Sequence, residues 1–235
     1  MPKLTLETLL PAFPNFRAAL VVGEGLTIPP ARSPTLAAEI AETERRCRET
    51  WGATELSAIP GVAAWRVAYR AFGIKRTSYR SSVERLIKRV LAGDALPEVN
   101  ALVDVYNAAS VDSGLCLGCD DLDATQGDLE FRYSRPGDSF LDMGVEAGED
   151  PNDPPKDGEV VYADARHVLC RRWNWRQDAR SKLTPASKRI VLTAQSNGAG
   201  DVEACAKSLA TRIERECGGK CRVYVVDRER PTAEF

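Results

Sequence analysis

The hydrophobic pattern of this 235-residue chain changes near Gly114. Before that glycine, apolar residues recur every three or four positions, which is the spacing of one face of an amphipathic helix. After it, short runs of branched and aromatic residues indicate β-strands. Helices are predicted at 35–51, at 60–72, from a capping box at 81–84 to about 93, at 98–109 and at 201–217. Strands are predicted at 17–22, 129–133, 159–163, 168–172, 190–194 and 222–226. This combination predicts the α/β (α+β) class.

The chain is long enough to bury a full hydrophobic core, so we expect one domain over residues 1–235. Two lobes are an alternative, with a mainly helical lobe at 1–113 and a mainly β lobe at 114–235. The hydrophobic share of 43% and the charged share of 28% are close to those of soluble globular proteins. Composition alone therefore favours an ordinary globular fold.

The formal net charge of −2 conceals a separation of charge along the chain. Six basic residues, among them Arg76, and one acid lie in 74–89, and eight basic residues and one acid lie in 166–189. The intervening segment 138–164 carries nine acids and one lysine. Since nucleic-acid binding depends on a local basic face, a nucleic-acid partner stays open. We expect the acidic loop to lie away from that face.

Cysteine usage and the lack of targeting signals indicate a cytoplasmic protein with no membrane partner. The N-terminus has no signal-peptide pattern, and no window approaches 18 apolar residues. Seven cysteines, an odd number, indicate reduced thiols. Cys116 and Cys119 have metal-ligand spacing and Cys217 and Cys221 could add two ligands, but two small buried thiols are the favoured interpretation. No metal site and no cofactor are predicted, since no phosphate loop or dinucleotide fingerprint occurs.

Two further polar groups have plain structural interpretations. His167 is the sole histidine, and no serine or cysteine elbow accompanies it, so we expect a residue at the edge of a strand. Asp120 and Asp121 could bind a hard cation, but no calcium-loop spacing follows them. Solvated loop carboxylates or a helix-capping role are the favoured interpretation of this pair.

The densest chemical signal is the segment 171–177, Arg-Arg-Trp-Asn-Trp-Arg-Gln. It holds three guanidinium groups, two indoles and two carboxamides. Guanidinium forks match phosphate and carboxylate oxygens, and tryptophan faces match aromatic rings or cations. The segment therefore indicates the wall of a site for an anionic, ring-bearing ligand. The alternative is a half-buried strand whose arginines extend over exposed indoles.

A series of motifs in fixed order resembles the editing module of the phenylalanyl-tRNA synthetase beta subunit, formed by its third and fourth domains. The motifs are the run Asn100-Ala-Leu-Val-Asp-Val-Tyr-Asn107, then Gly114, Asp120-Asp121, Gly127 and Arg132. Four more segments, 69–73, 81–84, 158–162 and 172–177, resemble free-standing versions of this module. The resemblance covers about residues 12–195.

The resemblance implies a compact α/β unit with a β-sandwich-like core and flanking helices. It also implies an activity, because the synthetase module hydrolyses tyrosine wrongly esterified to phenylalanine tRNA. Asn107 falls on a pocket position of that site. Gly118 falls where the synthetase carries a histidine, and Tyr106 replaces a smaller residue beside Asn107. These departures leave both the amino-acid specificity and the hydrolysis open.

An aminoacyl ester needs an oriented water and a stabilised oxyanion more than a strong nucleophile. The carboxamides of Asn107, Asn174 and Gln177 are candidates to position both. Glu159 or Glu84 could accept a proton if burial raised its pKa, although a capping-box role is favoured for Glu84. We therefore take Asn107, Asn174, Gln177 and Glu159 as the candidate catalytic residues.

The remaining candidates would bind the RNA or its aminoacyl group. Arg172 and Arg176 could hold phosphates of the acceptor end, and Trp173 or Trp175 could stack on the terminal adenine. The substrate and tRNA candidates are Arg172, Trp173, Trp175, Arg176, Arg80, Lys88, Arg89 and Gly118.

Three functions are compatible with these residues. The first is a trans-editing deacylase that binds tRNA and hydrolyses mischarged aminoacyl-tRNA. The second is a non-catalytic module that binds RNA or an aminoacyl ligand and lost hydrolysis when Gly118 replaced the histidine. The third, weaker alternative is a hydrolase of small amino-acid derivatives.

Overall fold

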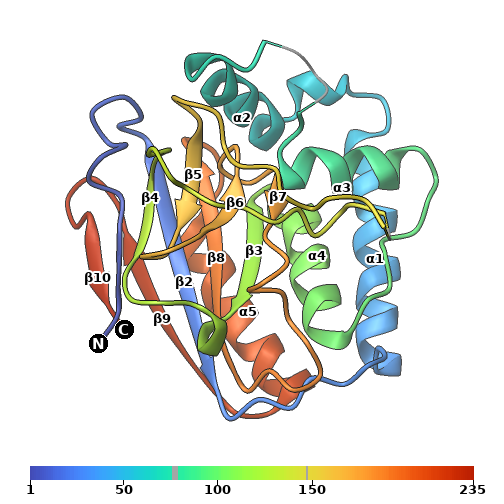
Figure 1. Cartoon of the computed structure of the whole chain (residues 1–235). Helices are drawn as coiled ribbons and strands as arrows, with labels where there is room; N and C mark the ends of the chain where they lie inside the picture. Colours follow the sequence, from blue (N-terminus) through green and yellow to red (C-terminus); the bar gives the residue numbers. More distant parts are fainter. Residues whose placement is uncertain (76–78, 147) are drawn as a thin grey trace.

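Two β-sheets lie face to face, and helices cover the outer side of one sheet and one end of the molecule (Figure 1). The computed structural model describes residues 1–75, 79–146 and 148–235, so Arg76 lies outside the described residues. The strand order is β10-β1-β4-β5-β6-β7 in the six-stranded sheet and β3-β8-β2-β9 in the four-stranded sheet. The strands are β1 (Lys3–Thr5), β2 (Phe16–Glu24), β3 (Cys116–Asp121), β4 (Leu129–Tyr133), β5 (Val160–Ala163), β6 (Val168–Arg171), β7 (Arg176–Gln177), β8 (Arg189–Asn197), β9 (Lys220–Val226) and β10 (Thr232–Glu234). The helices are α1 (Pro34–Trp51), α2 (Pro60–Ala71), α3 (Ser82–Leu91), α4 (Ala101–Ser113) and α5 (Val202–Cys217), with short 3-10 turns η1 (Leu56–Ala58) and η2 (Leu122–Ala124).

Strand β2 holds the four-stranded sheet together. Its sequence FRAALVVGE is buried except at Arg17 and Glu24, and it pairs antiparallel with both β8 and β9. A strand covered on both faces needs a continuous apolar run, which is what the sequence shows. The Phe16 ring contacts Phe131 of the six-stranded sheet and Trp173, with centroids 5.1 Å and 4.7 Å apart. The predicted α/β class with a β-sandwich-like core is confirmed.

The two halves of the chain interlock in both sheets. β1 and β2 come from the N-terminal part, yet β1 pairs with β4 and β10 while β2 pairs with β8 and β9. The helices α1 to α4 are inserted between β2 and β3. α4 and α5 pack against each other and cover the face of the four-stranded sheet that points away from the six-stranded sheet (Figure 1).

Local signals explain where the helices start and how closely they pack. The side chain of Ser33 caps α1 by accepting a hydrogen bond from the Leu36 amide at 3.0 Å. Gly61 lets α2 approach the turn after α4, because a Cβ atom there would lie 2.1 Å from the Gly114 carbonyl oxygen. Gly114 itself has φ 71°, the left-handed conformation that glycine adopts at helix ends. These contacts place α2 above the end of the sandwich.

Helix α3 begins where predicted, but its capping box is not formed. Ser81 is the N-cap residue, and its side chain makes no capping hydrogen bond. Glu84 instead accepts hydrogen bonds from Arg66 at 2.7 Å and from Arg80 at 3.0 Å. The carboxylate, buried to 2% exposure, therefore links α2 to α3 rather than stabilising the first turn of its own helix.

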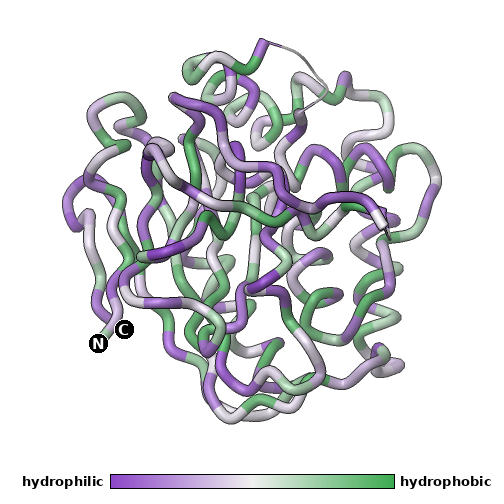
Figure 2. The backbone as a smooth tube through the Cα atoms, viewed as in Figure 1, coloured by the Kyte–Doolittle hydropathy of each residue, from purple (hydrophilic) through white to green (hydrophobic). Residues whose placement is uncertain are grey.

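The predicted strands and helices occur with boundary shifts of a few residues, whereas β1, β3, β7 and β10 were not predicted. Hydrophobic residues concentrate along the strands of the two sheets, and the connection between β4 and β5 is largely hydrophilic (Figure 2). In the part of the chain that the structure describes, no helix is long and apolar enough to cross a membrane.

Candidate functional site

The segment 171–177 forms a tight turn between β6 and β7, not the continuous strand of the alternative interpretation. Arg172 and Trp173 have φ values of 45° and 69°, in the left-handed region that residues with a side chain seldom occupy. Two such residues in succession are strained, and surrounding contacts must hold them there. The turn is closed by a hydrogen bond from the Trp175 amide to the Arg171 carbonyl at 3.1 Å.

Trp173 supplies the contacts that hold the turn. Its side chain is fully buried, and its ring meets those of Phe13, Phe16 and Trp65 at centroid distances of 4.7, 4.7 and 5.2 Å. A ring enclosed on these sides has no face free for a nucleic-acid base. The predicted stacking role of Trp173 is therefore wrong, because its burial between the sheets is what orients the turn.

The turn directs Asn174 into a buried chain of hydrogen bonds between the sheets. The Tyr69 hydroxyl donates to Asn174 Oδ1 at 2.9 Å, and Asn174 Nδ2 donates to Gln195 Oε1 at 3.2 Å. Gln195 Nε2 continues the chain to the hydroxyl of Thr193 at 2.9 Å. Each carboxamide has a second donor hydrogen, so Asn174 and Gln195 keep capacity for a further acceptor.

Strand register places an open space next to this chain. β3 pairs antiparallel with β8, so that Cys116 lies opposite Gln195 and Gly118 opposite Thr193. Opposite residues project from the same face of a sheet. Gly118 therefore shares the face of Gln195, which looks toward Asn174. A Cβ atom at Gly118 would meet no atom of the described chain within 4 Å.

Asp120 lies two residues further along the same face of β3. Its Oδ1 accepts hydrogen bonds from Gln177 Nε2 at 2.9 Å and from the Ser181 hydroxyl at 2.6 Å, and Gln177 also donates to the Cys119 carbonyl at 2.6 Å. Among the described residues, Oδ2 of Asp120 accepts no hydrogen bond. Gln177 thus connects the edge strand of one sheet to the edge strand of the other.

Burial raises the pKa of the Asp120 carboxyl from 3.8 to about 7, although the hydrogen bonds from Ser181 and Gln177 oppose this shift. A carboxyl group with a pKa near 7 can exchange a proton at neutral pH. The expectation of a solvated loop carboxylate is wrong for Asp120, which is 4% exposed. The capping expectation is confirmed for Asp121, whose Oδ1 accepts from the Asp123 amide at 3.0 Å.

We use the name Gly118 cleft for the open space at the Gly118 Cβ position and the residues around it, which are Gly118, Asp120, Asn174, Gln177 and Gln195. Three of the five were predicted from the sequence, namely Gly118, Asn174 and Gln177. Asp120 and Gln195 were not, because their burial depends on partners far away in the chain. The sequence offers one local sign that Asp120 could be buried, namely that this carboxylate directly follows the apolar run 115–119.

Neither Asn107 nor Glu159 forms a hydrogen bond with the residues of the cleft in the described part of the chain. Asn107 is half-buried on α4, and no side-chain hydrogen bond joins it to the cleft within the described residues. Glu159 is 5% exposed and binds Arg171 at 2.7 Å and Arg172 at 3.0 Å. Both guanidiniums lie against this carboxylate, which forms no hydrogen bond with the cleft among the described residues. The role of Glu159 as a proton acceptor stays a prediction.

Within the turn, Arg172 and Trp175 contact residues of the other basic segment, 74–89. The Arg172 guanidinium carbon lies 3.8 Å from the ring centroid of Tyr79 and 4.4 Å from that of Trp175. Burial lowers the pKa of Arg172, and Glu159 opposes that shift. Arg85 donates to the Trp175 carbonyl at 3.3 Å, which adds a contact from α3. Basic residues from 74–89 and from 166–189 thus meet around Trp175, which is half-buried.

The other predicted RNA contacts differ in accessibility. Lys88 and Arg89 are exposed on α3, whereas Arg80 is partly buried against Glu84. Arg176 crosses the Trp175 ring at 4.8 Å and forms an ion pair with Asp142.

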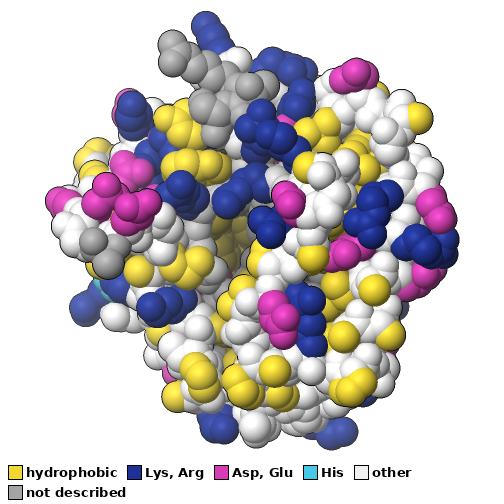
Figure 3. Space-filling view, turned by 90° about the vertical axis from the view of Figure 1, so that its right-hand side faces the viewer, with side chains coloured by type: hydrophobic (Ala, Val, Ile, Leu, Met, Phe, Trp, Pro, Cys, Tyr) yellow, Lys and Arg dark blue, Asp and Glu magenta, His cyan; other side chains and the backbone are white. Residues whose placement is uncertain are grey.

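The acidic segment 138–164 contacts basic residues of the turn, contrary to expectation. Asp142 binds Arg176, and Asp153 binds Arg171. That expectation was wrong because the loop between β4 and β5 packs against the β6–β7 turn. The side of the molecule that carries α1, α3 and α4 is hollowed near its centre, with Lys and Arg side chains above the recess (Figure 3).

The cysteines form no metal cluster. Cys116 and Cys119 lie three residues apart on a strand, so their side chains project from opposite faces of the sheet. Among residues 1–75, 79–146 and 148–235, no group of three or more histidine, cysteine or acidic side chains is arranged to hold a metal ion.

Comparisons with known proteins give a family match over more than half of the chain. The B3/4 domain model matches residues 64–218. One similar solved structure is an N-terminal fragment of the phenylalanyl-tRNA synthetase beta-subunit from Pyrococcus horikoshii, with 12% identity and a TM-score of 0.41. The alignment covers 93% of this chain and 50% of that fragment, so the chain spans about half of its length. No curated protein matches the chain.

Proposed function

The chain belongs to the B3/4 domain family, and from that premise we propose that it binds tRNA and hydrolyses mischarged aminoacyl-tRNA in the cytoplasm. The observation that carries this proposal is Asp120, a buried carboxyl with a pKa of about 7 beside the open space at Gly118. Hydrolysis of an ester at neutral pH needs a base with a pKa in this range.

In this mechanism the Asp120 carboxylate activates a water molecule in the Gly118 cleft. Gln177 and Ser181 both donate to Oδ1, which fixes the carboxylate plane and leaves Oδ2 for the water. The water oxygen bonds to the ester carbonyl carbon while one of its protons passes to Asp120. The carbonyl oxygen becomes an oxyanion.

The carboxamides of Asn174 and Gln195 each have a second donor hydrogen, and we propose that these stabilise the oxyanion. The bond between the carbonyl carbon and the ribose oxygen then breaks, and the proton moves from Asp120 to the ribose oxygen. The products are a free amino acid and tRNA with a free ribose hydroxyl. No covalent intermediate with the protein is formed.

The surface beside the cleft is suited to the RNA. Trp175 is half-buried, and Tyr79, Arg172 and Arg176 lie against its ring at 5.1, 4.4 and 4.8 Å, so the part of the ring that stays exposed is what would contact a base. Lys88 and Arg89 extend the positive charge along α3. Asn107 keeps its proposed place in the site through the resemblance alone.

A non-catalytic binder is the second candidate, and Gly118 favours it. In the family resemblance this glycine stands where the synthetase carries a histidine. If the histidine supplies the decisive interaction, then the open space at Gly118 would hold an aminoacyl group without hydrolysing it.

The test is to incubate the protein with a panel of mischarged tRNAs and to follow loss of the ester. The proposal predicts hydrolysis of at least one species by the wild type. It predicts a loss of about a hundredfold or more in Asp120→Asn, since a catalytic base contributes that much. Asp157→Asn removes the same charge at an exposed position and serves as the control. Binding of tRNA without hydrolysis of any ester would establish the binder instead.

A further inference from the structure

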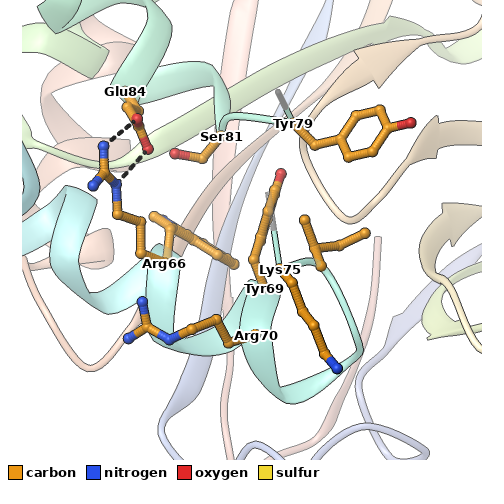
Figure 4. Close-up of a pocket in the computed structure, with 9 residues that line it drawn as sticks. Arg66, Tyr69, Arg70, Lys75, Tyr79, Ser81 and Glu84 are labelled. Atoms are coloured by element: carbon orange, nitrogen blue, oxygen red, sulfur yellow. Dashed lines mark hydrogen bonds and ion pairs between the residues drawn. The ribbon is translucent and has the colours of Figure 1, made fainter. Parts of the chain in front are cut away.

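A separate pocket lies between α2 and α3 (Figure 4). It encloses about 80 Å³. Tyr69 rises from α2 toward Ser81 and Tyr79, while Arg70 and Lys75 extend along the α2 side. We call it the α2–α3 pocket; its lining residues are Trp65, Arg66, Tyr69, Arg70, Ile74, Lys75, Tyr79, Ser81 and Glu84.

The charge of the α2–α3 pocket is positive. Glu84 is the one carboxylate among the described residues that line it, and it is already bound by Arg66 at 2.7 Å and by Arg80 at 3.0 Å. Arg70 and Lys75 form no ion pair with any residue in the described ranges. Exposed cations are usually solvated, so charge alone does not define a site.

A buried hydroxyl without a partner distinguishes this pocket from an ordinary basic surface. Ser81 is 2% exposed, and its Oγ has no hydrogen-bond partner within the described chain. Nε and Nη1 of Arg172 are buried without a partner there as well, but Arg172 lies against the Tyr79 ring and does not line the pocket. Buried polar groups are almost always paired, so the open Ser81 hydroxyl at the pocket wall fits a ligand that offers it a hydrogen-bonding oxygen.

Size restricts the ligand further. Pockets for whole small molecules usually measure roughly 300–1,000 Å³. The α2–α3 pocket is several times smaller, so it fits a single oxyanion group and not an entire nucleotide. A phosphate group has the charge, the acceptor oxygens and the size that these side chains require.

The position of the pocket indicates where the phosphate comes from. Tyr69 lines the pocket with its ring and donates its hydroxyl to Asn174 of the Gly118 cleft at 2.9 Å. One side chain therefore separates the two sites. We propose that the α2–α3 pocket binds a backbone phosphate of the single-stranded 3′ end of the RNA. This inference rests on the proposed function, because it names the part of the partner that the pocket recognises.

The experiment measures binding of two probes, inorganic phosphate and a short single-stranded RNA that ends in CCA. The test variant is Arg70→Gln with Lys75→Gln, and Ser81→Ala is the second variant. The matched control is Lys188→Gln with Lys220→Gln, which removes two exposed charges elsewhere. We expect the test variant to bind both probes about tenfold more weakly, since charge-assisted hydrogen bonds are lost. The control should bind like the wild type.

Ser81→Ala should weaken phosphate binding without a change of charge, and thermal unfolding shows that each variant is folded. Equal weakening in the test variant and the control would overturn the inference, because net charge would then explain it. Loss of phosphate binding with unchanged RNA affinity would also overturn it, since the pocket would then serve a free phosphate compound. Hydrolysis does not enter these measurements, so failure of the proposed deacylation would leave the binding result in place.

Discussion

Replacing Asp120 by asparagine should stabilise the protein at alkaline pH while it removes the proposed catalytic base. Asparagine has nearly the same shape, and its carbonyl oxygen can still accept the hydrogen bonds that Gln177 and Ser181 donate to Oδ1. The substitution therefore removes a buried negative charge with little change in packing.

The magnitude follows from the pKa of about 7, raised from 3.8. Because the folded state holds this proton more tightly than the unfolded state, the wild type loses stability as pH rises from about 4 to about 7. Each pKa unit corresponds to about 1.4 kcal/mol. Between pH 5 and pH 8 the stability of Asp120→Asn relative to the wild type should thus increase by about 3 kcal/mol.

Urea unfolding of both proteins at pH 5 and pH 8 measures this difference, since the other titrating groups are common to both proteins. In thermal unfolding the same change corresponds to a shift on the order of 6–12 °C for a chain of this size. Asp157→Asn is the control for removal of an exposed charge and should change stability little at either pH. If the difference in unfolding free energy between the wild type and Asp120→Asn were the same at both pH values, the claim that Asp120 is buried with a raised pKa would be refuted.

Three further results are expected. Gln177→Ala removes a hydrogen-bond donor to the Asp120 carboxylate, so the pKa of Asp120 should rise. The pH-rate profile of deacylation should then move to higher pH. An unchanged profile would show that Gln177 does not influence the pKa of the catalytic base. Gly118→Ala should fold with unchanged or slightly higher thermal stability, because the new Cβ atom has room. The added methyl group should raise KM, since it occupies part of the cleft. A large drop in melting temperature would show that the space is not open. The double variant Lys88→Glu with Arg89→Glu should bind tRNA more weakly and with a smaller dependence on salt. Titrations at several salt concentrations measure both effects. Unchanged affinity would show that α3 does not contact the RNA.

Much of the fold could be predicted from the sequence because most elements carry a local pattern. β2 is a continuous apolar run, and α1 has a serine cap and a buried stripe. β3 was missed because Cys-Leu-Gly-Cys-Asp-Asp shows neither an apolar run nor alternation. β1, β7 and β10 have only two or three residues, too few for a period to be visible.

The candidate site was predictable in composition but not in geometry. The density of arginine, tryptophan and amide groups in 171–177 marked the segment that supplies Asn174 and Gln177 to the Gly118 cleft. The left-handed conformation of Arg172 and Trp173 has no local signal, since it depends on burial of an indole between two sheets. The burial of Asp120 depends on Gln177 and Ser181, which lie 57 and 61 residues further along the chain. Such contacts follow only from the assembled sandwich.

The measurement that tests the central claim most directly is the pH dependence of deacylation by the wild type, compared with Asp120→Asn. The rate on a mischarged tRNA should rise with pH and level off with an apparent pKa of about 7, because only the ionised Asp120 carboxylate accepts the proton from water. In Asp120→Asn that pH-dependent activity should be absent. A wild-type rate without this inflection, or equal rates in the two proteins, would contradict the assignment of Asp120 as the base.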